Sequence, residues 1–348
     1  MNPAITRAFT LIYTLALLTL LTRVQLNLLG RRSYLSSVVS LATGGVESST
    51  ISLENHDDDN SDQAYGSDFE TNRRYLTFSW WLLHRGWKEV MVKVSDAVKE
   101  VFGSLSPRDD ISLQKFSELT LEVRKRVEGA TPAERNARQW LEYLLPPREL
   151  EDFVLKESGM AVESSNSGSV SISSSSITPL RRLLDETSDL IDSPPFTQVL
   201  TLLLDAGFST LVDTKLSTQA YKLPPNDPTE SAQQITEIID PQPVKLPIVL
   251  AILTRQAHSI GNGVPNEYLQ AMEQVRDLEA FAAVVYSSNW ESEILPLEEE
   301  GEASFVEVKN DRGIEVVEAG NGKDVEESII DVGTQSSFEN AWGKAVEK

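Results

Sequence analysis

The sequence predicts an all-α protein, a single large helical bundle built around a long central hydrophobic helix. The first reason is the opening stretch AFTLIYTLALLTLLT at residues 8–22, which contains no charged residue. The second is that apolar residues recur at steps of three and four in several later segments, as they do on one face of a helix. The third is that no useful length of chain alternates apolar and polar residues. This periodicity predicts about seven to nine helices.

The opening stretch has three interpretations, of which we favour a buried core helix. Arg7 and Arg23 bound its uncharged part, whose fifteen residues make about 22 Å of helix, against about 30 Å for a bilayer core. A membrane span over residues 8–29 would carry Arg23 into the membrane at a cost of about 2.5–3.5 kcal/mol. A signal peptide would need a small-residue cleavage site, which does not follow. Residues 30–33, GRRS, predict a stop or kink in the helix.

Charge is concentrated in two segments of the 348-residue chain, whose formal net charge is −22. Residues 291–348 hold 16 acids and 5 bases, and residues 47–70 hold 8 acids and no base, so these two segments account for 19 of the excess charges. Such composition is typical of disordered chain. A protein that binds nucleic acid normally has a basic face, so nucleic acid is excluded as a partner. The absence of cysteine excludes disulfides and thiolate metal sites.

These signals divide the chain into four parts. We expect the central core helix over 1–41, truncated at its start, and a disordered acidic loop over 42–74. The helical bundle then covers 75–290, with a Ser-rich loop at 157–178 and a Pro-rich loop at 223–243, and an acidic, mostly disordered tail follows over 291–348. The Ser-rich stretch either separates two domains or is a long surface loop within one.

Helix boundaries can be read from capping residues. Ser112 or Asp110, Thr131 and Ser193 each precede an apolar-periodic segment, and prolines follow Thr131 and Ser193 directly, as is typical of a first helical turn. Earlier in the chain, one stripe predicts a helix of about seven turns, and it consists of Leu83, Trp87, Val90, Val94, Val98 and Val101. Trp80, Trp81 and Trp87 are expected in the core or as an aromatic shelf that binds a peptide.

The last third predicts two further apolar helices. Residues 244–260, VKLPIVLAILTRQAHSI, are apolar on most sides, so we expect this segment to be buried like the first helix. Asn266 is expected to cap a single helix with a stripe that runs from Leu269 through Val275 to Val285.

No catalytic constellation can be assembled from the sequence. His56, His84 and His258 lack metal-ligand spacing, and glycine-rich phosphate loops are missing. Asp185, Glu186 and Asp189 share one helix face, which indicates a solvated face rather than paired acid–base carboxylates. We therefore expect no cofactor, no metal site and no enzyme activity. The predicted class is a helical binding or scaffold protein, with an apolar groove for an amphipathic partner helix.

Several collinear segments resemble the peroxin-3 family, in a fungal form. They are LLTRVQLNLLGRRSYL at 20–35, residues 98–128, residues 183–213, VKLPIVLA at 244–251 and residues 272–286. The resemblance implies a docking receptor on the cytosolic face of the peroxisomal membrane. It would bind the cargo chaperone peroxin-19, support membrane-protein insertion and peroxisome biogenesis, and in yeast relatives also bind inheritance and pexophagy factors. The alternative is an integral membrane scaffold that spans at residues 8–29 with a helical cytosolic domain.

The resemblance also implies where the partner binds. Lys245 matches a lysine of the family's groove, and Leu246, Ile248 and Val249 lie beside it in the sequence. Lys245 is equally typical of an exposed residue at a helix start. In relatives, a further stretch with the membrane anchor and the start of the long helix precedes the matching block. We therefore expect the anchor to be absent from this chain.

Overall fold

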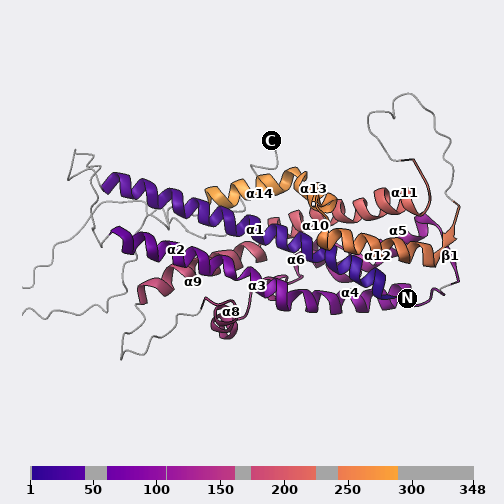
Figure 1. Ribbon diagram of the computed structural model, residues 1–348, viewed down its shortest axis with the longest axis horizontal. Helices are drawn as coiled ribbons and strands as arrows, with labels where there is room; N and C mark the ends of the chain where they lie inside the picture. The colour runs from indigo at the N-terminus through magenta and orange to yellow at the C-terminus, as the bar shows by residue number, and fades with distance from the viewer. Residues whose placement is uncertain (1, 44–60, 107, 161–173, 225–241, 289–348) are drawn as a thin grey trace, which may run out of the picture.

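A computed structural model describes residues 2–43, 61–106, 108–160, 174–224 and 242–288, which fold into an elongated helical bundle (Figure 1). The all-α fold class is confirmed for these residues. Their α-helices are α1 Asn2–Thr43, α2 Ser61–Thr77, α3 Ser79–Trp81, α4 Trp87–Phe102, α5 Leu113–Glu128, α6 Pro132–Asn136, α7 Leu141–Leu144, α8 Glu151–Glu157, α9 Ser174–Asp192, α10 Pro194–Ser209, α11 Ser217–Gln219, α12 Leu246–Asn262, α13 Glu267–Glu273 and α14 Arg276–Ser287. The π-helices η1 Leu82–Gly86 and η3 Thr210–Leu216, the 3-10 helix η2 Arg148–Leu150, and the strands β1 Asp110–Ile111 and β2 Val244–Lys245 complete the described elements.

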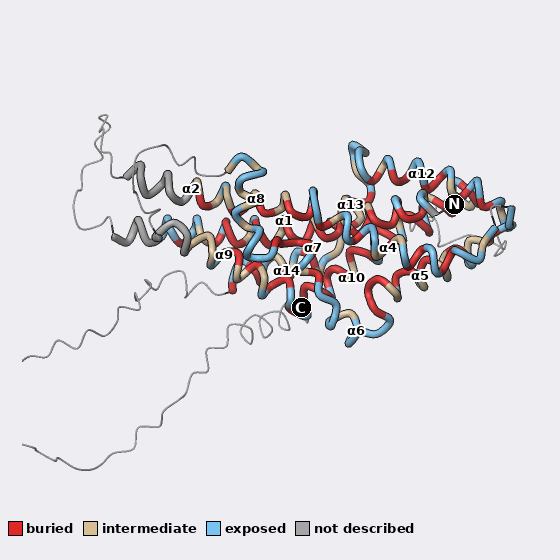
Figure 2. The backbone as a smooth tube through the Cα atoms, turned by 90° about the horizontal axis from the view of Figure 1, so that it is seen from below, coloured by how far each residue is buried: buried red, intermediate tan, exposed pale blue. Residues whose placement is uncertain are grey.

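Helix α1 runs along the centre of the bundle. It packs against α4, α10, α12 and α14 (Figure 1). Its buried residues are distributed along the helix from Ile5 to Leu29 (Figure 2). Because the helix is apolar on nearly all sides, neighbours on several sides are needed to remove it from water, and each buried leucine contributes about 1.5–3 kcal/mol.

The predicted stop at residues 30–33 is wrong. Helix α1 continues through them to Thr43. A Cβ atom added to Gly30 would lie 3.4 Å from the ring of Tyr286 on α14, so the small residue admits a close neighbour and does not end the helix. Arg31 is buried here and is bonded to other helices, which the sequence did not indicate.

The apolar stripe predicted from Leu83 to Val101 is correct from Val90 onward, on α4, and wrong at Leu83. Val90, Val94 and Val98 are buried, whereas Leu83 is exposed and Leu82 beside it is buried. Leu82 and Leu83 both lie in the π-helical segment η1, whose wider turn shifts the buried face by one residue. Periodicity alone carries no sign of such an insertion.

The predicted loops differ from the structure at their edges. Helix α2 occupies 61–74 of the segment expected to be loop, because acidic composition hid a helix that packs on α1 and α9. Helix α9 begins at Ser174, inside the predicted Ser-rich loop. The other parts of those two loops at 44–60 and 161–173, most of the Pro-rich loop at 225–241, and the predicted tail at 291–348 lie outside the described residues.

Three predicted caps are confirmed by hydrogen bonds. The side chains of Ser112, Thr131 and Ser193 accept from the backbone N–H three residues later, and Asn266 likewise caps α13. The single helix expected after Asn266 is two helices, however. The chain leaves helical geometry at Val275, which precedes α14 in an extended conformation.

The helices on both sides of the Ser-rich stretch pack together, since α9 contacts α1, α2 and α7, which all precede it. Within the described residues, Pro3–Val38 and Pro194–Gln219 are the two segments long and apolar enough to cross a membrane, and their most apolar windows are 67% and 61% buried inside the bundle. Burial among other helices is what the core-helix interpretation of residues 8–29 expects.

Candidate functional site

The four predicted partner-binding residues divide between the surface and the core. The Lys245 side chain is 60% exposed and Ile248 is 47% exposed, whereas Leu246 and Val249 are fully buried. The expectation that residues 244–260 are buried on most sides is therefore wrong. Strand β2 covers Val244–Lys245, and the helix that follows buries only one face.

The exposed face of α12 forms a short apolar surface between two cations. Pro247, Ile248 and Ala251 lie within a third of a turn of one another and are exposed, and Arg255 follows one turn later. Lys245 precedes them and pairs with Asp110 of β1 at 2.9 Å. We call these five residues, Lys245, Pro247, Ile248, Ala251 and Arg255, the α12 strip. A strip of this kind suits an amphipathic helix with an apolar face and acidic flanks.

The α12 strip is held in place at its start by backbone hydrogen bonds to β1 and to the residue before it. At its start, β2 pairs with β1 in antiparallel register, Asp110 opposite Lys245 and Ile111 opposite Val244. The backbone N–H of Leu246 also donates to the carbonyl of Asp109 at 3.1 Å. These bonds fix the direction in which the helix begins.

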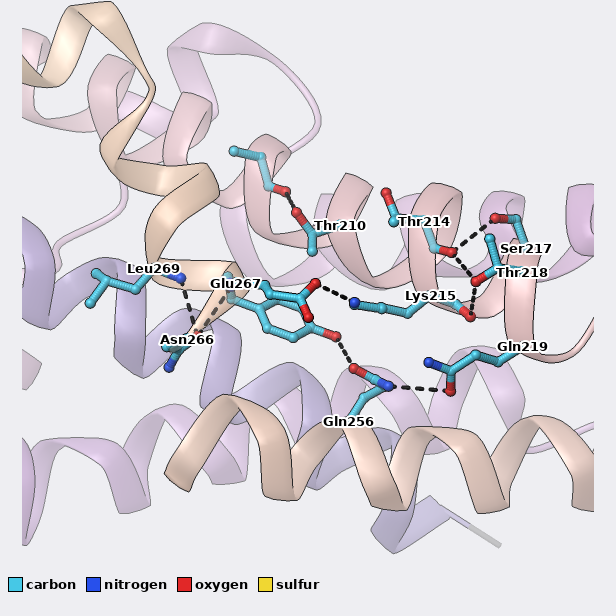
Figure 3. Close-up of polar contacts among 12 residues, drawn as sticks. Thr210, Thr214, Lys215, Ser217, Thr218, Gln219, Gln256, Asn266, Glu267 and Leu269 are labelled. Atoms are coloured by element: carbon cyan, nitrogen blue, oxygen red, sulfur yellow. Dashed lines mark hydrogen bonds and ion pairs between the residues drawn. The ribbon is translucent and has the colours of Figure 1, made fainter. Parts of the chain in front are cut away.

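The opposite face of α12 is anchored by polar contacts to its neighbours. Gln256 of α12 accepts a hydrogen bond from the Tyr268 hydroxyl of α13 at 2.8 Å and donates to Gln219 of α11 at 3.3 Å (Figure 3). Beside these bonds, Lys215 of η3 pairs with Glu267 and joins two of the neighbours of α12 to each other (Figure 3). Burial raises the pKa of the Tyr268 phenol, which keeps it a donor. Because these bonds fix the rotation of α12, its outer face presents Ile248 to solvent.

A separate groove lies between α1 and α4. It encloses about 740 Å³. Two of the α1 side chains in its wall, Thr6 and Thr10, are buried, and their hydroxyl oxygens have no hydrogen-bond partner. The opposite wall includes Trp87, expected in the core or on an aromatic shelf. The lining residues are Pro3, Thr6, Arg7, Thr10, Leu11 and Thr14 of α1, with Trp87, Met91, Val92, Ser95, Asp96 and Lys99 of α4.

The β1–β2 pair and the start of α12 lie at the end of the bundle where α1 begins (Figure 1). The groove is at the same end, because its α1 wall is formed by residues 3–14. The far end carries α2, α9 and the end of α1. Both candidate binding surfaces among the described residues are therefore gathered at one end of an elongated molecule.

The acidic residues of α9 serve structure. Glu186 accepts two hydrogen bonds from buried Arg31, at 2.6 and 2.9 Å, while Asp185 pairs with Arg181 at 2.6 Å. The Arg181 guanidinium lowers the pKa of Asp185, and burial raises the pKa of Asp189. Since Asp185 and Glu186 have different partners, they do not form an acid–base pair.

The two histidines in the described residues, His84 and His258, show no arrangement for catalysis or metal binding. His84 stacks on the ring of Trp80, and its Nδ1 lies 3.0 Å from the Trp80 carbonyl oxygen. His258 is exposed on α12, and His56 lies outside the described residues. Within the described parts of the chain, no group of three histidine, aspartate or glutamate side chains is placed to hold a metal ion.

Comparison with known proteins identifies the family. A family model described as Peroxin-3 matches residues 1–288. The chain belongs to the peroxin-3 family. It is 35% identical over 308 residues to a protein of Yarrowia lipolytica named peroxisomal biogenesis factor 3, an alignment that covers 82% of this chain and 67% of the relative.

Other members of the peroxin-3 family match over the same region. The peroxisomal membrane protein PEX3 of Komagataella phaffii is 29% identical, with 82% of this chain and 66% of the relative covered, and peroxisomal biogenesis factor 3 of Mus musculus is 27% identical, with 81% and 68% covered. The match thus spans about two thirds of these relatives' length. Membership places the chain among the peroxisome biogenesis factors of the peroxisomal membrane. The peroxin-3 family is not a known enzyme family.

Proposed function

We propose that this chain is a docking receptor on the cytosolic face of the peroxisomal membrane, which binds the cargo chaperone peroxin-19 and so supports the insertion of peroxisomal membrane proteins. Family membership supports the biogenesis role. Peroxin-19 as the partner rests on the resemblance of VKLPIVLA at 244–251 to the family's C-terminal block, in which Lys245 matches a lysine of the family's groove. The proposed contact surface is the α12 strip.

The observation that carries this proposal is the exposure of Ile248 between two cations on a fixed helix. A partner helix would bury Ile248 and Ala251 against its apolar face, and its acidic side chains would lie near Lys245 and Arg255. Leu246 and Val249 act indirectly, because they pack into the core and hold the strip in place. Apolar anchors surrounded by polar groups carry most of the affinity in such interfaces.

The test is a titration of the purified chain with a labelled peptide of the peroxin-19 N-terminal helix. We expect Ile248→Asp to weaken binding by about tenfold or more, because it places a charge at the apolar centre. Lys245→Glu should weaken binding less and should reduce its dependence on salt, because Lys245 lies at the rim.

Two variants on α5 provide matched controls. Leu121 is 51% exposed and Lys115 is an exposed lysine, so Leu121→Asp and Lys115→Glu make the same chemical changes away from α12. Unchanged binding is expected for both. If the peptide does not bind, or if the α12 and α5 variants weaken binding equally, the proposal is wrong.

The alternative is an integral membrane scaffold that spans at residues 8–29. In its favour, α1 has the length and hydropathy of a spanning helix. Against it, the same residues are buried against α4, α10, α12 and α14. Alkaline carbonate extraction of the chain expressed in cells separates the two: release into the supernatant excludes a span, and retention in the membrane pellet supports one.

A further inference from the structure

The groove between α1 and α4 is not used by the proposed function, which relies on the outer face of α12. We propose that this groove is a helix-docking site and that its occupant is the chain's own C-terminal segment, residues 336–347. The contact would be intramolecular and would cover the apolar wall that α1 and α4 leave open. The proposal goes beyond the docking of peroxin-19 and does not depend on it.

The lining of the groove calls for an apolar occupant. Thr6 and Thr10 are 7% and 5% exposed, and their hydroxyl oxygens are buried away from the groove, so the α1 wall presents little polar surface. The opposite wall presents Met91 and Val92, which are large exposed apolar side chains. The groove therefore suits the apolar face of a helix.

The dimensions of the groove suit a short helix. Its α1 wall runs from Pro3 to Thr14 and its α4 wall from Trp87 to Lys99. At about 1.5 Å of rise per residue, each wall is about 17 Å long, or three helical turns. A segment of about twelve residues fills this length.

The C-terminal segment has the sequence of such a helix. It reads SSFENAWGKAVE at residues 336–347, and Ser336 with Glu339 has the spacing of a capping box. Phe338, Ala341, Trp342 and Ala345 recur at steps of three and four, which puts them on one face. Twelve residues of helix are about 18 Å long, which equals the length of the groove.

The charges of the segment are compatible with the rim of the groove. The rim carries Arg7, together with Lys99 and Asp96, which pair at 3.0 Å. The polar side of the segment carries both signs, with Glu339 opposite in charge to Arg7 and Lys344 opposite in charge to Asp96.

Chain length permits the contact. Helix α14 ends at Ser287, and residues 289–335 precede the segment. That stretch spans up to about 155 Å when extended, so it reaches any point of the bundle. A covalent tether also raises the local concentration of the segment, to the millimolar range for short linkers and less for longer ones, so a weak intramolecular contact is populated.

Because the chain has no cysteine, introduced pairs report the contact without background. The test pair is Met91→Cys with Ala345→Cys in the full chain, oxidised at low protein concentration and followed on non-reducing gels. We expect a disulfide within one chain. It should form at least about tenfold more slowly when Trp342→Ala is added, since the anchor is lost.

The control pair is Ile248→Cys with Ala345→Cys, which puts an equally exposed site on α12 under the same tether. It should react at least about tenfold more slowly than the test pair. Met91 and Ile248 are both exposed, so all variants are expected to fold, which a thermal melt verifies. Equal rates for the two pairs, or no effect of Trp342→Ala, overturn the proposal. A disulfide between two chains also overturns it, because a second copy then occupies the groove.

Discussion

At its C-terminal end α1 buries Arg31, and at its N-terminal end it buries Thr6 and Thr10. The Arg31 guanidinium bonds to both carboxylate oxygens of Glu186 and to the carbonyls of Val285 and Ser288, so one side chain joins α1 to α9 and to the end of α14. The two threonine hydroxyls have no partner. Buried polar groups in folded proteins are normally satisfied, so the two ends of α1 differ in what burial of a polar side chain does to stability.

The largest expected effect is at the joint. Arg31→Ala removes the buried cation and leaves Glu186 and two carbonyls without their donor, so we expect a loss of about 3–5 kcal/mol in the free energy of unfolding. Denaturant unfolding followed by circular dichroism measures it. Lys115→Ala on the surface should change stability by less than about 0.5 kcal/mol. If Arg31→Ala lowers the free energy of unfolding no more than Lys115→Ala does, Arg31 does not act as a structural joint.

The next effect concerns η1, the π-helical segment that precedes α4. A Cβ atom on Gly86 would lie 1.9 Å from the carbonyl oxygen of Tyr143, so Gly86→Ala should cost about 2 kcal/mol as the backbones are pushed apart. Gly261 near the end of α12 has open space around it. Gly261→Ala should be neutral or stabilise by up to about 1 kcal/mol. Similar destabilisation by both would contradict the packing of η1 against α7.

A smaller effect, of opposite sign, tests the open end. Thr10→Val replaces the hydroxyl by a methyl group of similar size, so a buried polar group without a partner disappears. In a chain shortened to residue 335, we expect the unfolding free energy to rise by about 1 kcal/mol. The full chain should gain about as much, because the hydroxyl oxygen is buried away from the groove. A loss of stability in the shortened chain would show that the hydroxyl has a partner there.

The smallest effects depend on pH and lie beside the joint, on α9. Burial raises the folded-state pKa of Asp189, so its ionisation opposes folding as pH rises through that pKa. Arg181 lowers the pKa of Asp185, so that carboxylate stabilises the fold at neutral pH and the gain is lost as pH falls.

Two substitutions should therefore move stability in opposite directions at pH 7. Asp189→Asn should raise it and Asp185→Asn should lower it, each by less than about 1 kcal/mol because both carboxyls are partly exposed. Both stability differences should vanish when the pH is below the folded-state pKa of Asp185 and of Asp189, because both carboxyls are then protonated. Thermal melts across this range measure them, and shifts of the same sign at pH 7 would contradict the assigned partners.

Local chemistry made much of the fold predictable. The side chains of Ser112, Thr131, Ser193 and Asn266 cap helices as the sequence indicated, because a cap depends on residues within one turn. The apolar opening stretch predicted a core helix because Arg7 and Arg23 limit its uncharged part to about 22 Å of helix. These signals need no knowledge of the distant chain.

What the sequence did not predict depends on partners far along the chain. Arg31 resembled a helix stop, but its partner Glu186 lies 155 residues away. Leu82 is buried instead of Leu83, because a π-helix has more residues per turn than the α-helical period assumes. At the candidate site, Lys245 and Ile248 are on the surface while Leu246 and Val249 are not, because pairing with β1 fixes where α12 begins.

The most direct test of the central claim is hydrogen exchange of the full chain, measured with and without the peroxin-19 N-terminal peptide. The account predicts that amides of α1 between Ile12 and Leu29 exchange among the slowest in both states, and that the peptide slows exchange at residues 245–255. Fast exchange along α1, or peptide protection that leaves residues 245–255 unchanged, would contradict a docking surface carried by α12 on a bundle built around α1.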